Sequence, residues 1–151
     1  MRNVLLLAVL AATPLSSAYS QVIDPPNPAG QNELEAALVR SLEEKDLNKY
    51  QSLLANDIIV SQDGKIIAQN RAAWLRIFGE KLTAKGVSFK VAGRYSSSGR
   101  ILLIQYFNSV ASWGGDAPAE CCWSYDAVAY DYEGSKVTKI QILRGGDRTP
   151  N

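Results

Sequence analysis

Histidine is absent from the 151 residues, and cysteine occurs only twice. Without histidine there can be no Ser-His-Asp or Cys-His catalytic site, no histidine proton switch and no imidazole metal ligand. Two cysteines cannot form a Cys₄ zinc site, and a Cys₂His₂ finger is excluded as well. The sequence therefore predicts neither a metal site nor a metal-dependent cofactor.

An excess of positive charge is also missing. The chain has 16 basic and 15 acidic residues, so it offers no basic footprint for nucleic acid. Hydrophobic residues make up 46% and charged residues 21%, which is a globular rather than a disordered composition. The length fits a single domain, at roughly 100–200 residues per domain.

The first 20 residues have the pattern of a secretory signal peptide. Arg2 is followed by an apolar run, Val4 to Ala12, that is shorter than the roughly 20 residues needed to span a bilayer. Small residues follow it, so cleavage is expected after Ala18 or Ser20. A buried N-terminal helix is the alternative. We expect an exported protein, periplasmic or secreted, with no membrane segment after the signal is removed.

Residues 21–31 contain three prolines and a glycine, which predicts an extended linker rather than a helix or strand. The folded domain is therefore expected over residues 32–145, followed by a short tail over 146–151. About 115 residues are enough for one core with a cavity, but too few for two domains.

Three helices are predicted in the first half of this domain. Each begins at a residue that can cap a helix N-terminus: Asn32, with Glu35 in a capping-box position, then Asp46, then Asn70. Apolar residues recur at helical spacing after each cap. The residues expected to face inward are Leu34, Ala37, Leu38, Ser41 and Leu42, then Leu47, Tyr50, Leu53 and Leu54, then Trp74, Ile77, Phe78 and Leu82. Gly86 supplies a left-handed residue after the third helix.

After residue 86 the apolar residues recur at every second position instead of at helical spacing, which indicates strands. After a short strand at 58–60 and a hairpin turn at 62–65, strands are expected at 87–91, 100–111, 121–131 and 136–143. Turns are expected at 93–99 and 132–135, and a polar loop at 113–120. Helices followed by strands predict a single α+β domain with a curved, mostly antiparallel sheet packed on the helices.

Two strings resemble the nuclear transport factor 2-like superfamily, whose SnoaL-like and ketosteroid-isomerase-like members form a cone. One string runs from Lys45 through Leu53-Leu54-Ala55-Asn56-Asp57 to Asp63-Gly64-Lys65; the other is the closing hairpin, 126–143. The resemblance covers residues 32–145 and is closest to a subfamily of small secreted domains rather than to a named enzyme. It implies a fold, whereas function depends on the site.

The resemblance implies that Asp126 faces the interior of the cone. In the related ketosteroid isomerases this position carries a carboxylic acid that stays protonated and binds an oxyanion, because burial in an apolar cavity favours the neutral form. Asp126 is the candidate catalytic residue for an isomerase or lyase. The alternative is that it lies on a solvated face or pairs with an arginine.

The rest of that isomerase site differs. The position of the general base is occupied by Gln62, with Asp63 one place off, and the position of a tyrosine donor is occupied by Leu38. An amide and an aliphatic side chain cannot transfer the required protons. We therefore expect a non-catalytic domain that binds a small apolar ligand in its cone.

Aromatic and polar residues are candidates for lining this pocket, although aromatics at such spacing are also typical of a core. They are Tyr50, Trp74, Phe78, Phe89, Tyr106, Ser124, Asp126 and Tyr130.

The opposite face of the strand at 121–131 carries Trp123 and Tyr125. Exposed aromatics on a sheet predict a covered surface, and relatives of this fold often form dimers through that face. We expect a homodimer. The alternative is a protein–protein interaction module, whose function is carried by the outer sheet or by the loop at 113–120. Adjacent Cys121 and Cys122 point to opposite faces of a strand, so a bond between them is strained, and free or intermolecular thiols are expected.

Overall fold

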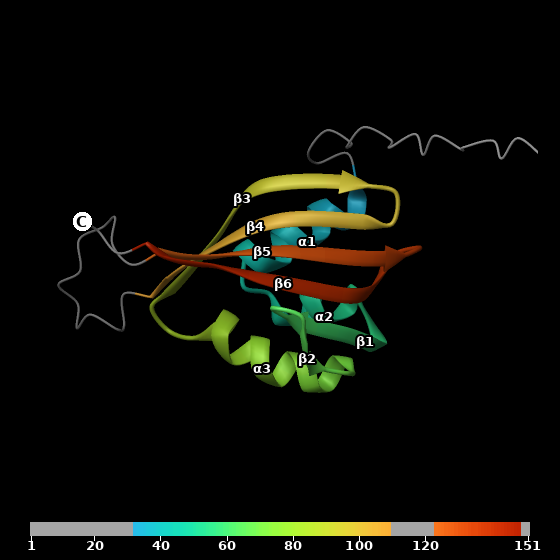
Figure 1. Ribbon diagram of the computed structural model, residues 1–151, viewed down its shortest axis with the longest axis horizontal. Coiled ribbons are helices and arrows are strands. Elements are labelled where there is room, and N and C mark those ends of the chain that lie inside the picture. Colours follow the sequence, from blue (N-terminus) through green and yellow to red (C-terminus); the bar gives the residue numbers. More distant parts are fainter. Residues whose placement is uncertain (1–31, 110–122, 149–151) are drawn as a thin grey trace, which may run out of the picture.

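The computed structural model describes residues 32–109 and 123–148 (Figure 1). The helices are α1 (Glu33–Glu43), α2 (Leu47–Ser52) and α3 (Arg71–Thr83). The strands are β1 (Leu54–Gln62), β2 (Lys65–Ala68), β3 (Val87–Ser97), β4 (Arg100–Ser109), β5 (Trp123–Glu133) and β6 (Lys136–Arg148). The predicted α+β class is confirmed. Residues 1–31, Cys121, Cys122 and the loop at 113–120 lie outside the described residues.

The strands form one mixed sheet in the order β2-β1-β6-β5-β4-β3, in which β1 and β6 are parallel and the other neighbours are antiparallel. Irregularities interrupt the register at Ala92 in β3 and twice in β6, at Thr138 and Gly145, and such bulges bend a strand. The helices lie against one side of the sheet, with α3 beside β1 and β2 and with α1 behind β3 (Figure 1). This arrangement is the expected cone.

The predicted helix caps are confirmed. The side chain of Asn32 accepts hydrogen bonds from the backbone N–H groups of Leu34 and Glu35, Asp46 accepts from Lys49, and Asn70 accepts from Ala73. Asn32 also donates from Nδ2 to the Tyr132 hydroxyl. The cap of α1 therefore also holds that helix against the sheet.

Two predictions on local structure were wrong. Leu54 was expected on the second helix, but α2 ends at Ser52 and Leu54 begins β1, where it pairs with Val137. Residues 93–99 were expected to form a turn, but β3 continues to Ser97 and only Ser98 and Gly99 turn. Gly93 is a close-approach residue, because a Cβ there would lie 2.8 Å from Ile104 Cγ1.

Two other predictions, one on burial and one on a strand end, differ less from the structure. Ile77 was expected in the core, but it is 45% exposed because it lies at the edge of the buried face of α3. Strand β6 continues to Arg148, beyond the expected end of the domain at residue 145, since it pairs with β5 as far as Trp123. Gly86 has a positive φ of 76°, as expected for the turn after α3.

Candidate functional site

The inner face of the sheet and the buried face of α3 enclose a cavity of about 70 Å³. It is lined by Gln62, Ile67, Trp74, Ile77, Phe78, Lys81, Gln105, Phe107, Asp126, Val128, Tyr130 and Ile142. Typical ligand pockets hold about 300–1,000 Å³. The volume therefore fits a few non-hydrogen atoms, or one end of a larger molecule that enters through the mouth.

Four of the predicted site residues line this cavity. Trp74 and Phe78 come from α3, one turn apart, with their rings stacked at 4.8 Å and 14°. Asp126 and Tyr130 come from the inner face of β5, where alternate residues point to the same side. The cavity thus has an aromatic wall from the helix and a polar wall from the sheet.

The other four lie elsewhere. Tyr50 is fully buried behind the lining residues, 5.2 Å from Phe78 between ring centroids. Phe89 is core, in edge contact with Phe107 at 4.6 Å. Ser124 is half-buried but does not line the cavity. Tyr106 was placed in the pocket wrongly: β4 alternates with Gln105 and Phe107 inward, so Tyr106 lies on the outer face beside Tyr125.

A chain of buried hydrogen bonds forms the floor of the cavity. The Trp74 indole Nε1 donates to the Tyr50 hydroxyl at 3.0 Å, and Gln105 Nε2 donates to the Tyr130 hydroxyl at 2.5 Å. A hydrogen bond also joins the hydroxyls of Tyr50 and Tyr130. The Tyr130 hydroxyl thus has two polar neighbours, Gln105 and Tyr50, at the wall of the cavity.

Both tyrosines stay protonated at ordinary pH. Burial raises the pKa of Tyr130 to about 12, against the smaller lowering by Gln105 and Tyr50. Burial, followed by the proximity of Tyr130, raises the pKa of Tyr50 well above its usual range. Tyr130 is therefore a neutral hydroxyl whose oxygen is polarised by the Gln105 donor, and such hydroxyls are good hydrogen-bond donors.

Asp126 lies at the mouth of the cavity and is paired with a cation. The ammonium of Lys81 is 3.3 Å from Asp126 Oδ2, and it lies 3.5 Å from the centroid of the Phe107 ring. A carboxylate in an ion pair accepts hydrogen bonds, whereas the resemblance implied a carboxylic acid that donates one. Asp126 therefore pairs with a basic side chain, as the alternative prediction stated, but the partner is Lys81 and not an arginine.

The residues at the isomerase-like positions lie in different surroundings. Gln62 lines the cavity, whereas Leu38 is fully buried in the core and does not line it. Asp63 lies in the β1–β2 turn with a φ of 49°, and its Oδ1 accepts from the Arg144 backbone N–H. Among the residues that the structure describes, Asp126 is the one carboxylate that lines this cavity.

Sequence reasoning missed Lys81, Gln105 and Phe107. Lys81 follows Phe78 by three residues and Trp74 by seven, so helical spacing places all three on one face. Gln105 falls between Leu103 and Phe107 on the buried side of β4, where a polar side chain is conspicuous. The periodic pattern therefore contained both signals.

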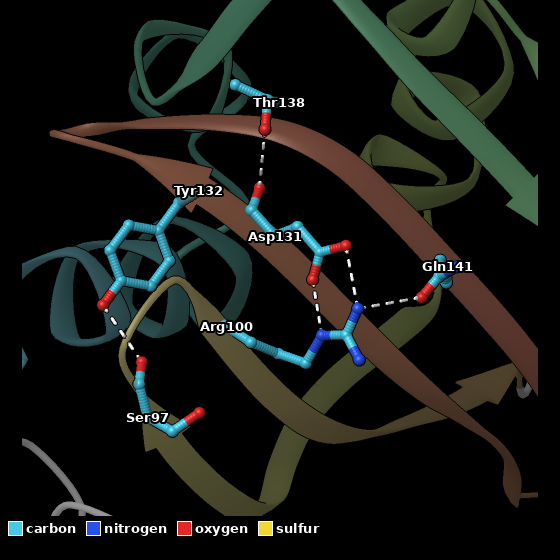
Figure 2. A network of polar contacts seen from close by, with 6 residues as sticks. All are labelled: Ser97, Arg100, Asp131, Tyr132, Thr138 and Gln141. Carbon is cyan, nitrogen blue, oxygen red and sulfur yellow. Dashed lines mark hydrogen bonds and ion pairs between the residues drawn. The ribbon is translucent and has the colours of Figure 1, made fainter. Parts of the chain in front are cut away.

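The outer face of the sheet has a second, open hollow of about 370 Å³. Ala127 and Ala129 form its floor, and Leu102 and Leu143 stand beside it, 36% and 62% exposed. At one end Arg100 donates to both carboxylate oxygens of Asp131 and to Gln141 (Figure 2). An apolar hollow is thus bordered by an ordered polar network.

Figure 2 also shows how this end of the sheet is tied together. The Tyr132 hydroxyl donates to the carbonyl of Ser97, and Thr138 donates to the carbonyl of Asp131. The hydrogen bond to Asp131 raises the pKa of Arg100 further above its already high value. Arg100 therefore stays charged on this face at any pH at which the domain is folded.

In the described part of the chain, no helix is long and apolar enough to cross a membrane. Within the same residues, no three side chains of histidine, cysteine, aspartate or glutamate come together as metal ligands would.

Comparison with known proteins identifies the fold. No family model matches the sequence, and no curated protein matches it significantly. A candidate ketosteroid isomerase from Kribbella flavida DSM 17836 superimposes with a TM-score of 0.59 at 15% identity, over 78% of this chain and 79% of that chain. An NTF2-like protein of unknown function from Cytophaga hutchinsonii ATCC 33406 gives 0.54 at 10% identity, over 74% and 86%.

A third similar structure is an LEH-like epoxide hydrolase from M. tuberculosis, with a TM-score of 0.55 at 9% identity, over 74% of this chain and 79% of that chain. These likenesses show that the chain has the nuclear transport factor 2-like fold, as its sequence resemblance predicted.

Proposed function

We propose that this chain is an exported, non-catalytic domain that binds a small apolar molecule in its cone. In this proposal Tyr130 donates a hydrogen bond to an oxygen atom of that molecule. The observation that carries the proposal is the Tyr130 hydroxyl, which accepts from Gln105 and lines the cavity together with apolar side chains such as Phe78 and Val128. A hydroxyl that accepts a hydrogen bond can also donate one, and the proposal places the acceptor in the cavity. A ketone or ether oxygen on a small apolar body has the matching chemistry.

Non-catalytic binding is preferred to isomerase or lyase chemistry for a geometric reason. Acid–base catalysis on a carbonyl compound needs a base near the substrate. The carboxylate that the described residues place at the cavity, Asp126, is held by Lys81 at its mouth, and Gln62 cannot accept a proton at neutral pH. The similar structures named as enzymes support a small-molecule site in this fold and leave the chemistry to its residues.

Replacement of Tyr130 by phenylalanine is expected to weaken the binding of cyclopentanone about five- to tenfold, because one hydrogen bond is worth about 1 kcal/mol. The binding of cyclopentane, which has the same ring without the oxygen, is expected to change little. Titrations of both compounds followed by amide chemical shifts measure this difference.

The exposed Tyr95 provides the matched control, since Tyr95→Phe removes a hydroxyl on the outer face. Equal losses for cyclopentanone and cyclopentane in Tyr130→Phe would contradict the assigned donor. No binding of either compound to the unmodified protein would contradict the ligand-binding function itself.

The same proposal includes a homodimer formed through the outer face of the sheet. Leu143 protrudes beside a hollow floored by alanines, so one face carries both a protruding side chain and a recess. In a two-fold dimer each copy can insert its Leu143 into the hollow of the other, which is the self-complementarity that such symmetry requires. Leu102 and Tyr125 add apolar area to the patch.

Substitution of Leu143 by lysine is expected to convert the dimer to a monomer, because it places a charge at the centre of the apolar contact. Light scattering after size-exclusion chromatography measures the mass. Ile66→Lys is the control, because Ile66 is exposed to a similar extent, at 58%, but lies on edge strand β2. A monomeric unmodified protein would overturn the dimer.

Export by residues 1–20 is also part of the proposal, since it rests on their sequence pattern. N-terminal sequencing of protein recovered from outside the cytoplasm is expected to begin at Tyr19 or Gln21. An intact Met1 or Arg2 would contradict it.

A further inference from the structure

The mouth of the cavity holds an ammonium group, contributed by the protein itself. Lys81 Nζ lies 3.3 Å from Asp126 Oδ2 and 3.5 Å from the centroid of the Phe107 ring. A carboxylate on one side and an aromatic face on the other are the two groups that recognise organic ammonium ions in proteins. The two groups come from neighbouring strands, β5 and β4.

The receiving half of this arrangement is buried and fixed. Asp126 and Phe107 are 8% and 4% exposed, and Phe107 is held by its edge contact with Phe89 at 4.6 Å. Lys81, whose ammonium lies between these two groups, is less buried than they are. Its side chain is 44% exposed and lies in the last turn of α3. A lysine with a flexible four-carbon stem can move its ammonium into water without any change in the sheet.

We propose that the Asp126 carboxylate and the Phe107 ring form a binding site for the ammonium of a small apolar amine, and that Lys81 occupies this site until the amine displaces it. The exchange keeps the charge at the mouth unchanged, because one ammonium replaces another. The apolar part of the amine then enters the cavity between Phe78 and Val128, which line it. The inference rests on the proposed function, since both use the same cavity.

Removal of Lys81 makes this exchange measurable. Lys81→Ala leaves the carboxylate and the ring without their internal occupant, and a tethered competitor acts at millimolar effective concentration. The variant is expected to bind n-butylammonium at least about tenfold more tightly than the unmodified protein does. Binding of n-butanol, which has similar shape but no charge, is expected to rise far less. Isothermal titration of the full mature chain gives the four affinities.

Two further variants separate this site from general effects. Lys85→Ala removes an exposed lysine four residues further along the chain and is expected to leave both affinities unchanged. Lys81→Ala combined with Asp126→Asn is expected to lose the preference for n-butylammonium over n-butanol, because the amide carries no charge.

Equal gains for n-butylammonium and n-butanol in Lys81→Ala would overturn the ammonium site, since they would reflect only a wider mouth. No gain for n-butylammonium, or a preference that persists in the double variant, would overturn it as well. These outcomes are distinct from failure of the proposed function, which would appear as absent binding of cyclopentanone to the unmodified protein.

Discussion

Raising the pH from 10 to 12 is expected to lower the free energy of unfolding by roughly 2 kcal/mol through Tyr130 alone. Burial raises the pKa of Tyr130 to about 12 in the folded domain, while in the unfolded chain it titrates near its usual value of 10.0. Between these values the unfolded chain loses a proton that the folded chain keeps. The stabilisation is therefore complete below pH 10 and is lost as the pH rises through 12.

Tyr50 adds to this alkaline sensitivity in the same direction, since burial raises its pKa well above the model-compound range. Urea unfolding at a series of pH values measures the slope. Tyr130→Phe is expected to reduce the slope by up to about 1.4 kcal/mol per pH unit, whereas Tyr95→Phe, on the exposed outer face, is expected to leave it unchanged. A stability that is flat from pH 10 to 12 would contradict the buried tyrosine pair.

Truncation of Tyr50 to alanine is expected to lower the free energy of unfolding by about 3–5 kcal/mol, because it removes a fully buried ring. Tyr50→Phe keeps the ring but takes away the oxygen that accepts from Trp74 Nε1, leaving a buried donor without its partner. That change alone is expected to cost about 1–3 kcal/mol.

The pair of variants separates packing from hydrogen bonding at one position. Equilibrium unfolding in urea gives both values. A Tyr50→Phe variant as stable as the unmodified protein would show that the hydrogen bond from Trp74 does not stabilise the floor of the cavity. An alanine variant that loses less than the phenylalanine variant would contradict the packing role of the ring.

Much of the fold follows from local signals in the sequence. Asn32, Asp46 and Asn70 mark the helix starts because each side chain reaches a backbone N–H in the first turn. The hairpin at Asp63 and Gly64 follows from residues that accept a positive φ. The errors occurred where a local signal has two meanings: Gly93 reads as a turn residue, but the sheet uses it for close approach to Ile104.

The site was predictable only in part, for a related reason. Counting by two from Ile101 places Tyr106 outside the cone and Gln105 inside it, so the alternation could have corrected one and revealed the other. The pairing of Lys81 with Asp126 joins residues 45 positions apart and depends on how α3 crosses β5. The volume of the cavity depends on how α3 packs over side chains from five strands, which no local pattern specifies.

The central claim, that the cone rather than the outer hollow binds a small apolar molecule, is tested most directly by nuclear Overhauser effects between bound cyclopentanone and methyl groups of the protein. Val128 lines the cavity and Leu143 lines the outer hollow, so the two report on the two faces of the same sheet. We expect contacts to the Val128 methyl groups and none to Leu143. Contacts to Leu143 without contacts to Val128 would contradict the account.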